Sequence, residues 1–105
     1  MGRLDEKVAI VTGGSAGLGR ADAIGLAREG AKVVVTDVNE AEGRKVAAEI
    51  NALHPGAAIF LVQDVRDETR WQEVVAETVQ KFGGLHILVN NAGVVKIATP
   101  ESCTL

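Results

Sequence analysis

A glycine-rich turn after a short apolar strand is the first feature of this sequence that could bind a ligand. The apolar residues 8–11 run directly into the pattern T-G-x-x-x-G-x-G, which supplies Gly13, Gly17 and Gly19. Glycines let backbone N–H groups approach an anion without obstruction by Cβ atoms, and a helix beginning near Gly17 would point its unpaired N–H donors at that anion. The pattern predicts a phosphate or pyrophosphate site. The alternative is an ordinary strand-to-helix turn.

Three further polar motifs stand at the ends of apolar stretches. Asp37 follows Gly19 by 18 positions, Asp64 and Val65 follow the next apolar run, and N-N-A-G occupies residues 90–93. An acidic residue about 20 positions after a glycine-rich turn typically accepts hydrogen bonds from the ribose of a dinucleotide. For each aspartate the alternative is a residue that only turns the chain or caps a helix.

The surrounding pattern predicts the elements that position these motifs. The expected strands are residues 8–11, 32–36, 57–62 and 86–89, and the expected helices begin near Gly17, Asn39 and Asp67 and stop at Gly30, Pro55 and Gly83. The apolar stripes expected on these helices are Leu18, Ala21, Ile24 and Ala27, then Val46, Ala47, Ile50 and Leu53, and then Trp71, Val74, Val75, Thr78, Val79 and Phe82. Strands separated by crossover helices predict one parallel α/β sheet with right-handed connections and the polar motifs at its carboxyl edge.

Together, the glycine pattern and N-N-A-G resemble the short-chain dehydrogenase/reductase family. The resemblance implies a Rossmann-like, doubly wound sheet of strand order 3-2-1-4, here with four strands and three helices. It implies that residues 1–105 are an NAD-binding half-domain of a longer single-domain enzyme. The cofactor-binding residues that it implies are Gly13, Ser15, Gly17, Leu18, Gly19, Asp37, Asp64, Val65, Asn90, Asn91, Ala92 and Gly93.

Individual roles also follow from the resemblance. The Asp64 carboxylate is expected to accept from the adenine amino group while the Val65 N–H donates, and the two asparagines are expected to tie the fourth strand to the turn. Ser15 is expected to cap the first helix or donate to phosphate, and Thr12 to bond across to the fourth strand.

NAD is the expected cofactor, in preference to NADP. A carboxylate at Asp37 would repel a 2′-phosphate by about 4 kcal/mol at ~4 Å and an effective dielectric constant of ~20. Family members that prefer NADP tend to carry a basic residue at the positions that Ala16 and Val38 hold here.

The resemblance implies an oxidoreductase that transfers hydride between nicotinamide and an alcohol or ketone, a small-molecule substrate, and a homo-oligomer when full length. Family catalysis uses a Tyr-x-x-x-Lys pair with an upstream Ser, and this chain contains no Tyr. The 105 residues are therefore expected to bind cofactor without turnover and to supply no catalytic residue. The alternative is a stand-alone or vestigial nucleotide-binding module.

The net charge and the cysteine and histidine content restrict the binding partners and the cellular location that we expect. A formal net charge of −3 argues against nucleic acid or an anionic membrane as a partner. Cys103 is the only cysteine, so no intrachain disulfide can form, and with a polar start to the chain the expected location is the cytoplasm. His54 and His86 lack metal-ligand spacing, so no metal site is expected.

Overall fold

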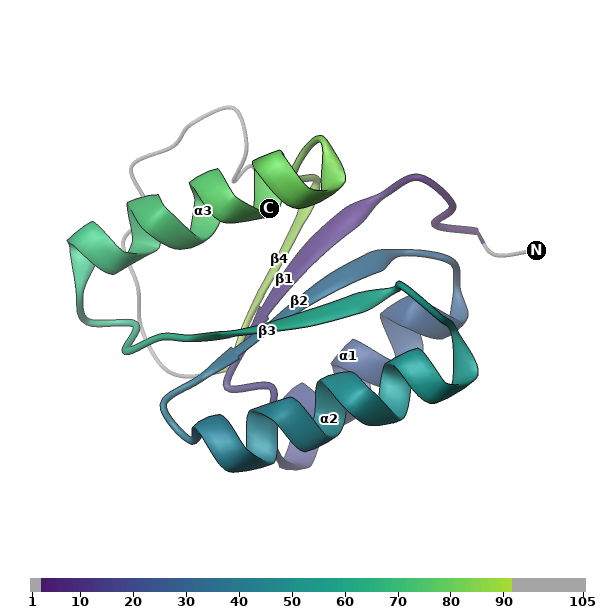
Figure 1. Cartoon of the computed structure of the whole chain (residues 1–105), viewed down its shortest axis with the longest axis horizontal. Helices are drawn as coiled ribbons and strands as arrows, with labels where there is room; N and C mark the ends of the chain where they lie inside the picture. Colours follow the sequence, from purple (N-terminus) through teal and green to yellow (C-terminus); the bar gives the residue numbers. More distant parts are fainter. Residues whose placement is uncertain (1–2, 92–105) are drawn as a thin grey trace.

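Seven elements alternate along residues 3–91, the part of the chain that the computed structural model describes. In order they are β1 (Val8–Thr12), α1 (Gly17–Arg28), β2 (Lys32–Asp37), α2 (Glu40–Leu53), β3 (Ala58–Val62), α3 (Glu68–Phe82) and β4 (Ile87–Asn90). The strands pair in parallel in the order β3-β2-β1-β4. Helices α1 and α2 cover one face of the sheet and α3 covers the other (Figure 1). The predicted Rossmann-like, doubly wound sheet is confirmed.

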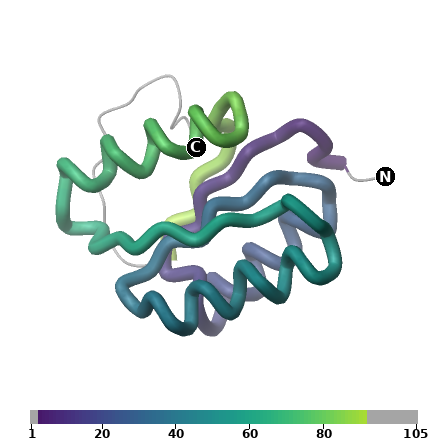
Figure 2. Tube along the Cα trace, in the orientation of Figure 1, coloured from purple at the N-terminus to yellow at the C-terminus, as the bar shows by residue number. Residues whose placement is uncertain are grey.

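The carboxyl ends of the strands are level with one another. Thr12 at the end of β1 pairs with Thr36 in β2 on one side and with Asn90 in β4 on the other. Asp37 at the end of β2 pairs with Val62 at the end of β3. The chain therefore leaves β1, β2 and β3 at the same edge of the sheet, as the tube in Figure 2 shows.

The core consists of two apolar layers, one on each face of the sheet. Successive strand residues point to opposite faces, so Val11 packs toward α1 and α2 while Ile10 packs toward α3. All five residues of β1 are buried, as expected for a strand covered on both faces. No helix within residues 3–91 combines the length and the apolar character needed to cross a bilayer.

Helix α1 buries a narrow face of small residues. Gly19, Ala23 and Ala27, spaced four apart, are its buried positions. The predicted stripe is wrong at Leu18, which is 77% exposed, and at Ala21, which is also exposed. A three-residue step falls about 60° short of a full helical turn, so a stripe built on such steps rotates away from the sheet.

Side-chain caps begin two of the three helices described. The Asn39 Oδ1 atom accepts from the Glu42 N–H at the start of α2, and the Asp67 Oδ1 atom accepts from the Arg70 N–H at the start of α3, both at 3.1 Å. The prediction that helices begin near Asn39 and Asp67 is confirmed. Helix α1 differs, because its N-cap residue, Ala16, offers no side-chain hydrogen bond.

Helices α2 and α3 bury most of their predicted faces. Val46, Ala47 and Ile50 are buried in α2, and Trp71, Val74 and Thr78 are buried in α3. Leu53 and Val79 are 69% and 44% exposed, so the predicted stripes are wrong there. In α2 the close contact is made instead at Gly43, where an added Cβ would lie 2.0 Å from the Phe60 ring. The absence of a side chain therefore lets α2 approach β3.

Candidate nucleotide-binding site

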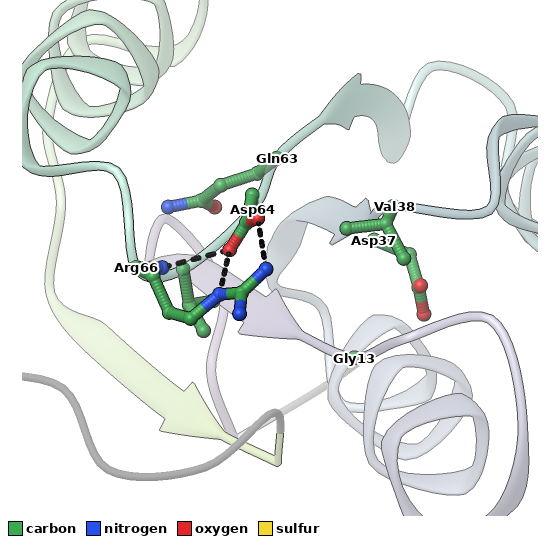
Figure 3. Close-up of a pocket in the computed structure, with 7 residues that line it drawn as sticks. Gly13, Asp37, Val38, Gln63, Asp64 and Arg66 are labelled. Atoms are coloured by element: carbon green, nitrogen blue, oxygen red, sulfur yellow. Dashed lines mark hydrogen bonds and ion pairs between the residues drawn. The ribbon is translucent and has the colours of Figure 1, made fainter.

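A cavity of about 200 Å³ opens at the carboxyl edge of the sheet. Its lining comes from the segments that follow β1, β2 and β3, and comprises Gly13, Asp37, Val38, Gln63, Asp64, Val65 and Arg66. Figure 3 shows Asp37 and Val38 on one side, Asp64 and Arg66 on the other, and Gly13 between them. Strands far apart in sequence thus place two carboxylates around one hollow.

The glycine-rich turn has a backbone path that needs glycine. Gly13 and Gly17 have φ angles of 61° and 58°, in the left-handed region. At Gly19 the constraint is close approach, since an added Cβ would lie 2.0 Å from the Gly13 carbonyl oxygen. The first turn of α1 therefore rests against the turn that precedes it, with its N-terminal N–H groups at the carboxyl edge. Leu18 lies on this first turn, largely exposed and outside the cavity lining.

The Asp37 carboxylate is held in place by hydrogen bonds from Ser15 and Asn39. Its Oδ2 atom accepts from the Ser15 hydroxyl at 2.6 Å and the Ser15 N–H at 3.2 Å, and its Oδ1 atom accepts from the Asn39 N–H at 3.1 Å. Partial burial raises the pKa of Asp37, but the hydrogen bonds from Ser15 and Asn39 outweigh it and leave the pKa below its ordinary value. The prediction that Ser15 caps α1 is wrong, because its hydroxyl is directed to Asp37.

Asp64 is paired with a residue that the sequence reading missed. Its Oδ1 atom accepts from the Arg66 N–H at 3.0 Å and from Nε at 3.1 Å, and the second guanidinium nitrogen reaches Oδ2 at 2.8 Å (Figure 3). Hydrogen bonds from the Arg66 side chain and backbone hold the pKa of Asp64 at about 2. The sequence signal for this pair was an arginine two residues after Asp64. At that spacing the side chain of Arg66 can turn back and bind the carboxylate within the same loop.

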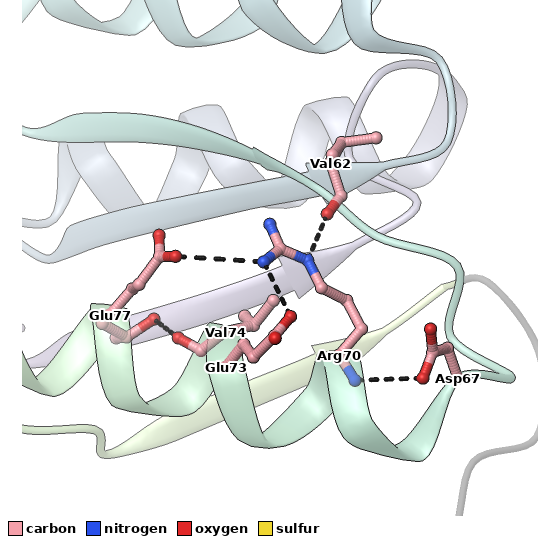
Figure 4. A network of polar contacts seen from close by, with 7 residues as sticks. Val62, Asp67, Arg70, Glu73, Val74 and Glu77 are labelled. Carbon is pink, nitrogen blue, oxygen red and sulfur yellow. Dashed lines mark hydrogen bonds and ion pairs between the residues drawn. The ribbon is translucent and has the colours of Figure 1, made fainter.

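The loop that carries Asp64 is anchored to α3. The Trp71 indole N–H donates to the Val65 carbonyl at 2.9 Å. Arg70 binds the Val62 carbonyl through Nε at 2.8 Å and also contacts Glu73 and Glu77 (Figure 4). The end of β3 and the first turn of α3 therefore hold residues 63–66 from both sides.

Gln63 is a second residue that the sequence reading missed. Its side chain is buried, at 2% exposure, and neither amide atom has a hydrogen-bond partner in the described chain. The same holds for the hydroxyl of Thr36, which is completely buried on the neighbouring strand. Buried polar groups usually have partners, so an orphaned amide in a cavity lining fits a site built for a ligand with polar edges. The sequence signal for Gln63 was its position directly after β3. Side chains along that strand alternate between the two faces of the sheet, and the alternation continued by one residue turns Gln63 toward a covered face, where it is buried.

The fourth strand is tied to β1 through Thr12, as predicted. The Thr12 hydroxyl donates to Asn90 Oδ1 at 2.8 Å and accepts from the Asn91 N–H at 3.1 Å. The Asn91 amide also donates to Asp22 of α1 at 3.2 Å, which links β4 to the helix after the turn. The predicted residues Ala92 and Gly93 lie outside the described residues, as does Cys103.

Neither histidine takes part in this cavity. His86 has a structural contact, because its Nδ1 atom accepts from the Val8 N–H at 3.0 Å at the start of β1. Within residues 3–91 no three His, Cys, Asp or Glu side chains are grouped to hold a metal ion.

The fold is a Rossmann-like α/β domain, and comparisons with known proteins identify its family. Residues 7–104 match the short chain dehydrogenase family. The 2,5-dichloro-2,5-cyclohexadiene-1,4-diol dehydrogenase of Sphingobium indicum is 48% identical over 93 residues, covering 89% of this chain and 37% of the relative. The 3-alpha-(or 20-beta)-hydroxysteroid dehydrogenase of Mycobacterium bovis is 44% identical over 104 residues, covering 99% and 38%.

A solved structure gives the same result. A hydroxysteroid dehydrogenase from Escherichia coli superposes with a TM-score of 0.82 at 41% identity, over 88% of this chain and 39% of that one. This chain belongs to the short-chain dehydrogenase/reductase family of oxidoreductases. It spans less than two fifths of the length of the relatives described here.

Proposed function

We propose that this chain is the NAD-binding half-domain of a short-chain dehydrogenase and that the cavity holds the adenosine half of the cofactor. The observation that carries the proposal is the placement of Asp37 and Asp64 around one cavity beside the glycine-rich turn. The orphaned amide of Gln63 in the lining adds support, because a base with polar edges would supply partners.

Each element of the site has a proposed role toward the dinucleotide. The N–H groups of residues 13–19 bind the pyrophosphate, supported by the helix N-terminus behind them. Asp37 accepts from the ribose, Asp64 accepts from the adenine amino group, and the Val65 N–H donates to the base. Thr12, Asn90 and Asn91 fix the end of β4 against the turn, and the family resemblance assigns Ala92 and Gly93 as further cofactor-binding positions. The bound cofactor supplies the nicotinamide that exchanges hydride with substrate.

We also propose a preference for NAD over NADP. At ~4 Å and an effective dielectric constant of ~20, the repulsion between Asp37 and a 2′-phosphate is about 4 kcal/mol, a discrimination of roughly a thousandfold. Titration of the chain with NADH and with NADPH tests this, and equal or tighter NADPH binding would refute it. The double variant Asp37→Ala, Val38→Arg should shift the preference toward NADP.

The proposed reaction is hydride transfer between the cofactor and a small-molecule alcohol or ketone. The relatives named above are dehydrogenases of hydroxylated compounds, and we propose the same reaction class for the enzyme that contains this chain, acting as a homo-oligomer in the cytoplasm. A positioned general acid or base contributes roughly 10²–10⁴-fold to rate, and the family assigns that role to a tyrosine. Because residues 1–105 contain no Tyr, we expect them to bind cofactor without turnover.

A stand-alone or vestigial nucleotide-binding module remains the second candidate, favoured by the same lack of Tyr. Reading the gene beyond Leu105 discriminates the two, since a Tyr-x-x-x-Lys in frame would support the enzyme. Assays of the 105-residue chain and of any longer product with NAD and a panel of secondary alcohols complete the test. Turnover by the short chain at the rate of the long one would contradict the assignment of roles.

A further inference from the structure

We propose that Asn51 and Arg70 close the outer edge of β3 and thereby keep the chain from pairing through that edge with a second copy of itself. This inference does not depend on the proposed function, because it concerns the edge of the sheet and not the cavity. β3 is the outermost strand on its side of the described sheet, and α2 and α3 flank it (Figure 1). Asn51 lies in α2 and Arg70 lies in α3.

The hydrogen bonds between β2 and β3 show which backbone groups of β3 face outward. The Ala57 carbonyl accepts from the Val33 N–H at 2.7 Å. The Gln63 N–H donates to the Asp37 carbonyl at 3.0 Å. In a parallel pair, alternate residues direct both of their backbone groups to the same side. The N–H and C=O groups that face the outer edge of β3 are therefore those of residues 58, 60 and 62.

An edge of this kind is suited to pairing with another strand. A row of unpaired N–H and C=O groups is a template for strand addition, and residues 57–62 read A-A-I-F-L-V, an apolar run without charge, Gly or Pro. Antiparallel pairing of two copies about Phe60 would set Phe60 opposite its counterpart and Ala58 opposite Val62. A second copy of this chain is therefore the partner that the edge fits.

Side chains already occupy both ends of this edge. Asn51 bonds to Ala58 as a neighbouring strand would, because its Nδ2 atom donates to the Ala58 carbonyl at 2.8 Å and its Oδ1 atom accepts from the Ala58 N–H at 2.9 Å. The Arg70 Nε atom donates to the Val62 carbonyl at 2.8 Å, and two glutamates of α3 hold the guanidinium there (Figure 4). A strand from a second copy can bond along the whole edge only by displacing both side chains.

The test measures self-association of the 105-residue chain by sedimentation equilibrium over a range of concentrations. The variants are Asn51→Ala, Arg70→Met, which keeps an apolar stem and removes the donors, and the double variant. The matched control is Asn39→Ala, which removes the side-chain cap at the other end of α2 and so lowers stability without changing the β3 edge. Amide hydrogen exchange at Phe60 locates the contact, because pairing through the β3 edge protects its N–H.

In the double variant we expect the association constant to rise at least about tenfold, since three backbone groups become free to bond, and the Phe60 N–H to become protected as the concentration increases. The single variants should show smaller rises, because each opens one end of the edge. Asn39→Ala should associate as the wild type does. If circular dichroism shows that the double variant does not fold, Arg70→Met alone carries the comparison.

Three results would each overturn the inference. The first is an association constant that is unchanged in the folded variants. The second is a rise of the same size in Asn39→Ala, which would make lost stability the cause. The third is association that leaves the Phe60 N–H unprotected, which would place the contact on another surface.

Discussion

Replacing Gly19 with alanine should disrupt the turn and with it the proposed nucleotide site. The new Cβ would lie 2.0 Å from the Gly13 carbonyl oxygen, 2.8 Å from its carbonyl carbon and 3.0 Å from the Gly14 Cα atom. All three atoms belong to backbone, so the turn or the helix must move by about 1 Å to restore ordinary contact. Overpacking of this kind costs about 1–3 kcal/mol, of which up to about 1 kcal/mol is offset by the better helix propensity of alanine.

Gly25 is the matched control, since it lies in the same helix and an added Cβ there meets nothing within 4 Å. Gly25→Ala should stabilise the chain by about 0.5–1 kcal/mol, an increase of several degrees in the melting temperature of a domain of this size. Gly19→Ala should instead lower the free energy of unfolding by up to about 2 kcal/mol, the overpacking cost less the gain in helix propensity.

Urea unfolding followed by circular dichroism measures both changes, and titration with ADP-ribose measures the site. We expect Gly19→Ala to bind ADP-ribose at least tenfold more weakly, because displacing the Gly13 carbonyl also displaces the N–H groups of the turn, and one lost hydrogen bond to a charged group costs about 1.5–3 kcal/mol. Gly25→Ala should bind as the wild type does. If Gly19→Ala matched Gly25→Ala in both assays, the close approach of α1 to the turn would not constrain the site.

Three further substitutions test other parts of the structure. Thr12→Val removes the buried hydroxyl that donates to Asn90 Oδ1 and accepts from the Asn91 N–H, and should cost about 1–3 kcal/mol in chemical unfolding, with recovery in Thr12→Ser. Gln63→Met removes an orphaned amide at similar volume and should leave stability unchanged or higher; a loss would show that the amide has a partner in solution. The pKa of Asp64 in the folded chain, about 2, lies below the ordinary 3.8, so the stability from its pairing with Arg66 should be complete above pH ~4 and lost as the pH falls toward 2. Arg66→Gln should flatten this part of the stability profile, and an unchanged profile would contradict the pairing.

Much of the architecture could be predicted from local pattern. The unbroken apolar run of β1 predicts a strand covered on both faces, and Asn39 and Asp67 mark helix starts because their short acceptors reach the N–H three residues on. Alternation of strands and helices then implies a parallel sheet. These signals act over a few residues, so they remain visible in the sequence.

The predicted buried faces of the helices were less accurate. The spacing of apolar residues indicates that a helix has one buried face, but it does not fix which residues of that face point directly at the sheet. Leu18 and Leu53 fit an apolar stripe by spacing and are exposed, whereas Gly19 and Gly43 are buried. Glycine contributes nothing to an apolar pattern, yet its lack of a side chain is what lets each helix approach its neighbour. Only packing in three dimensions reveals that advantage.

The sequence by itself therefore determined the family, the order of the elements and the edge at which the polar motifs gather. The tertiary structure alone decided the partners of those motifs: Ser15 with Asp37, Arg66 with Asp64, and an unpaired Gln63 beside them. Ser15 and Asp37 are brought together by the parallel pairing of β1 and β2, which makes neighbours of residues 22 positions apart. A hydrogen bond forms only when the donor–acceptor distance is correct to within a few tenths of an ångström. The spacing of residues along the chain does not fix the distance between side chains on different strands to that precision.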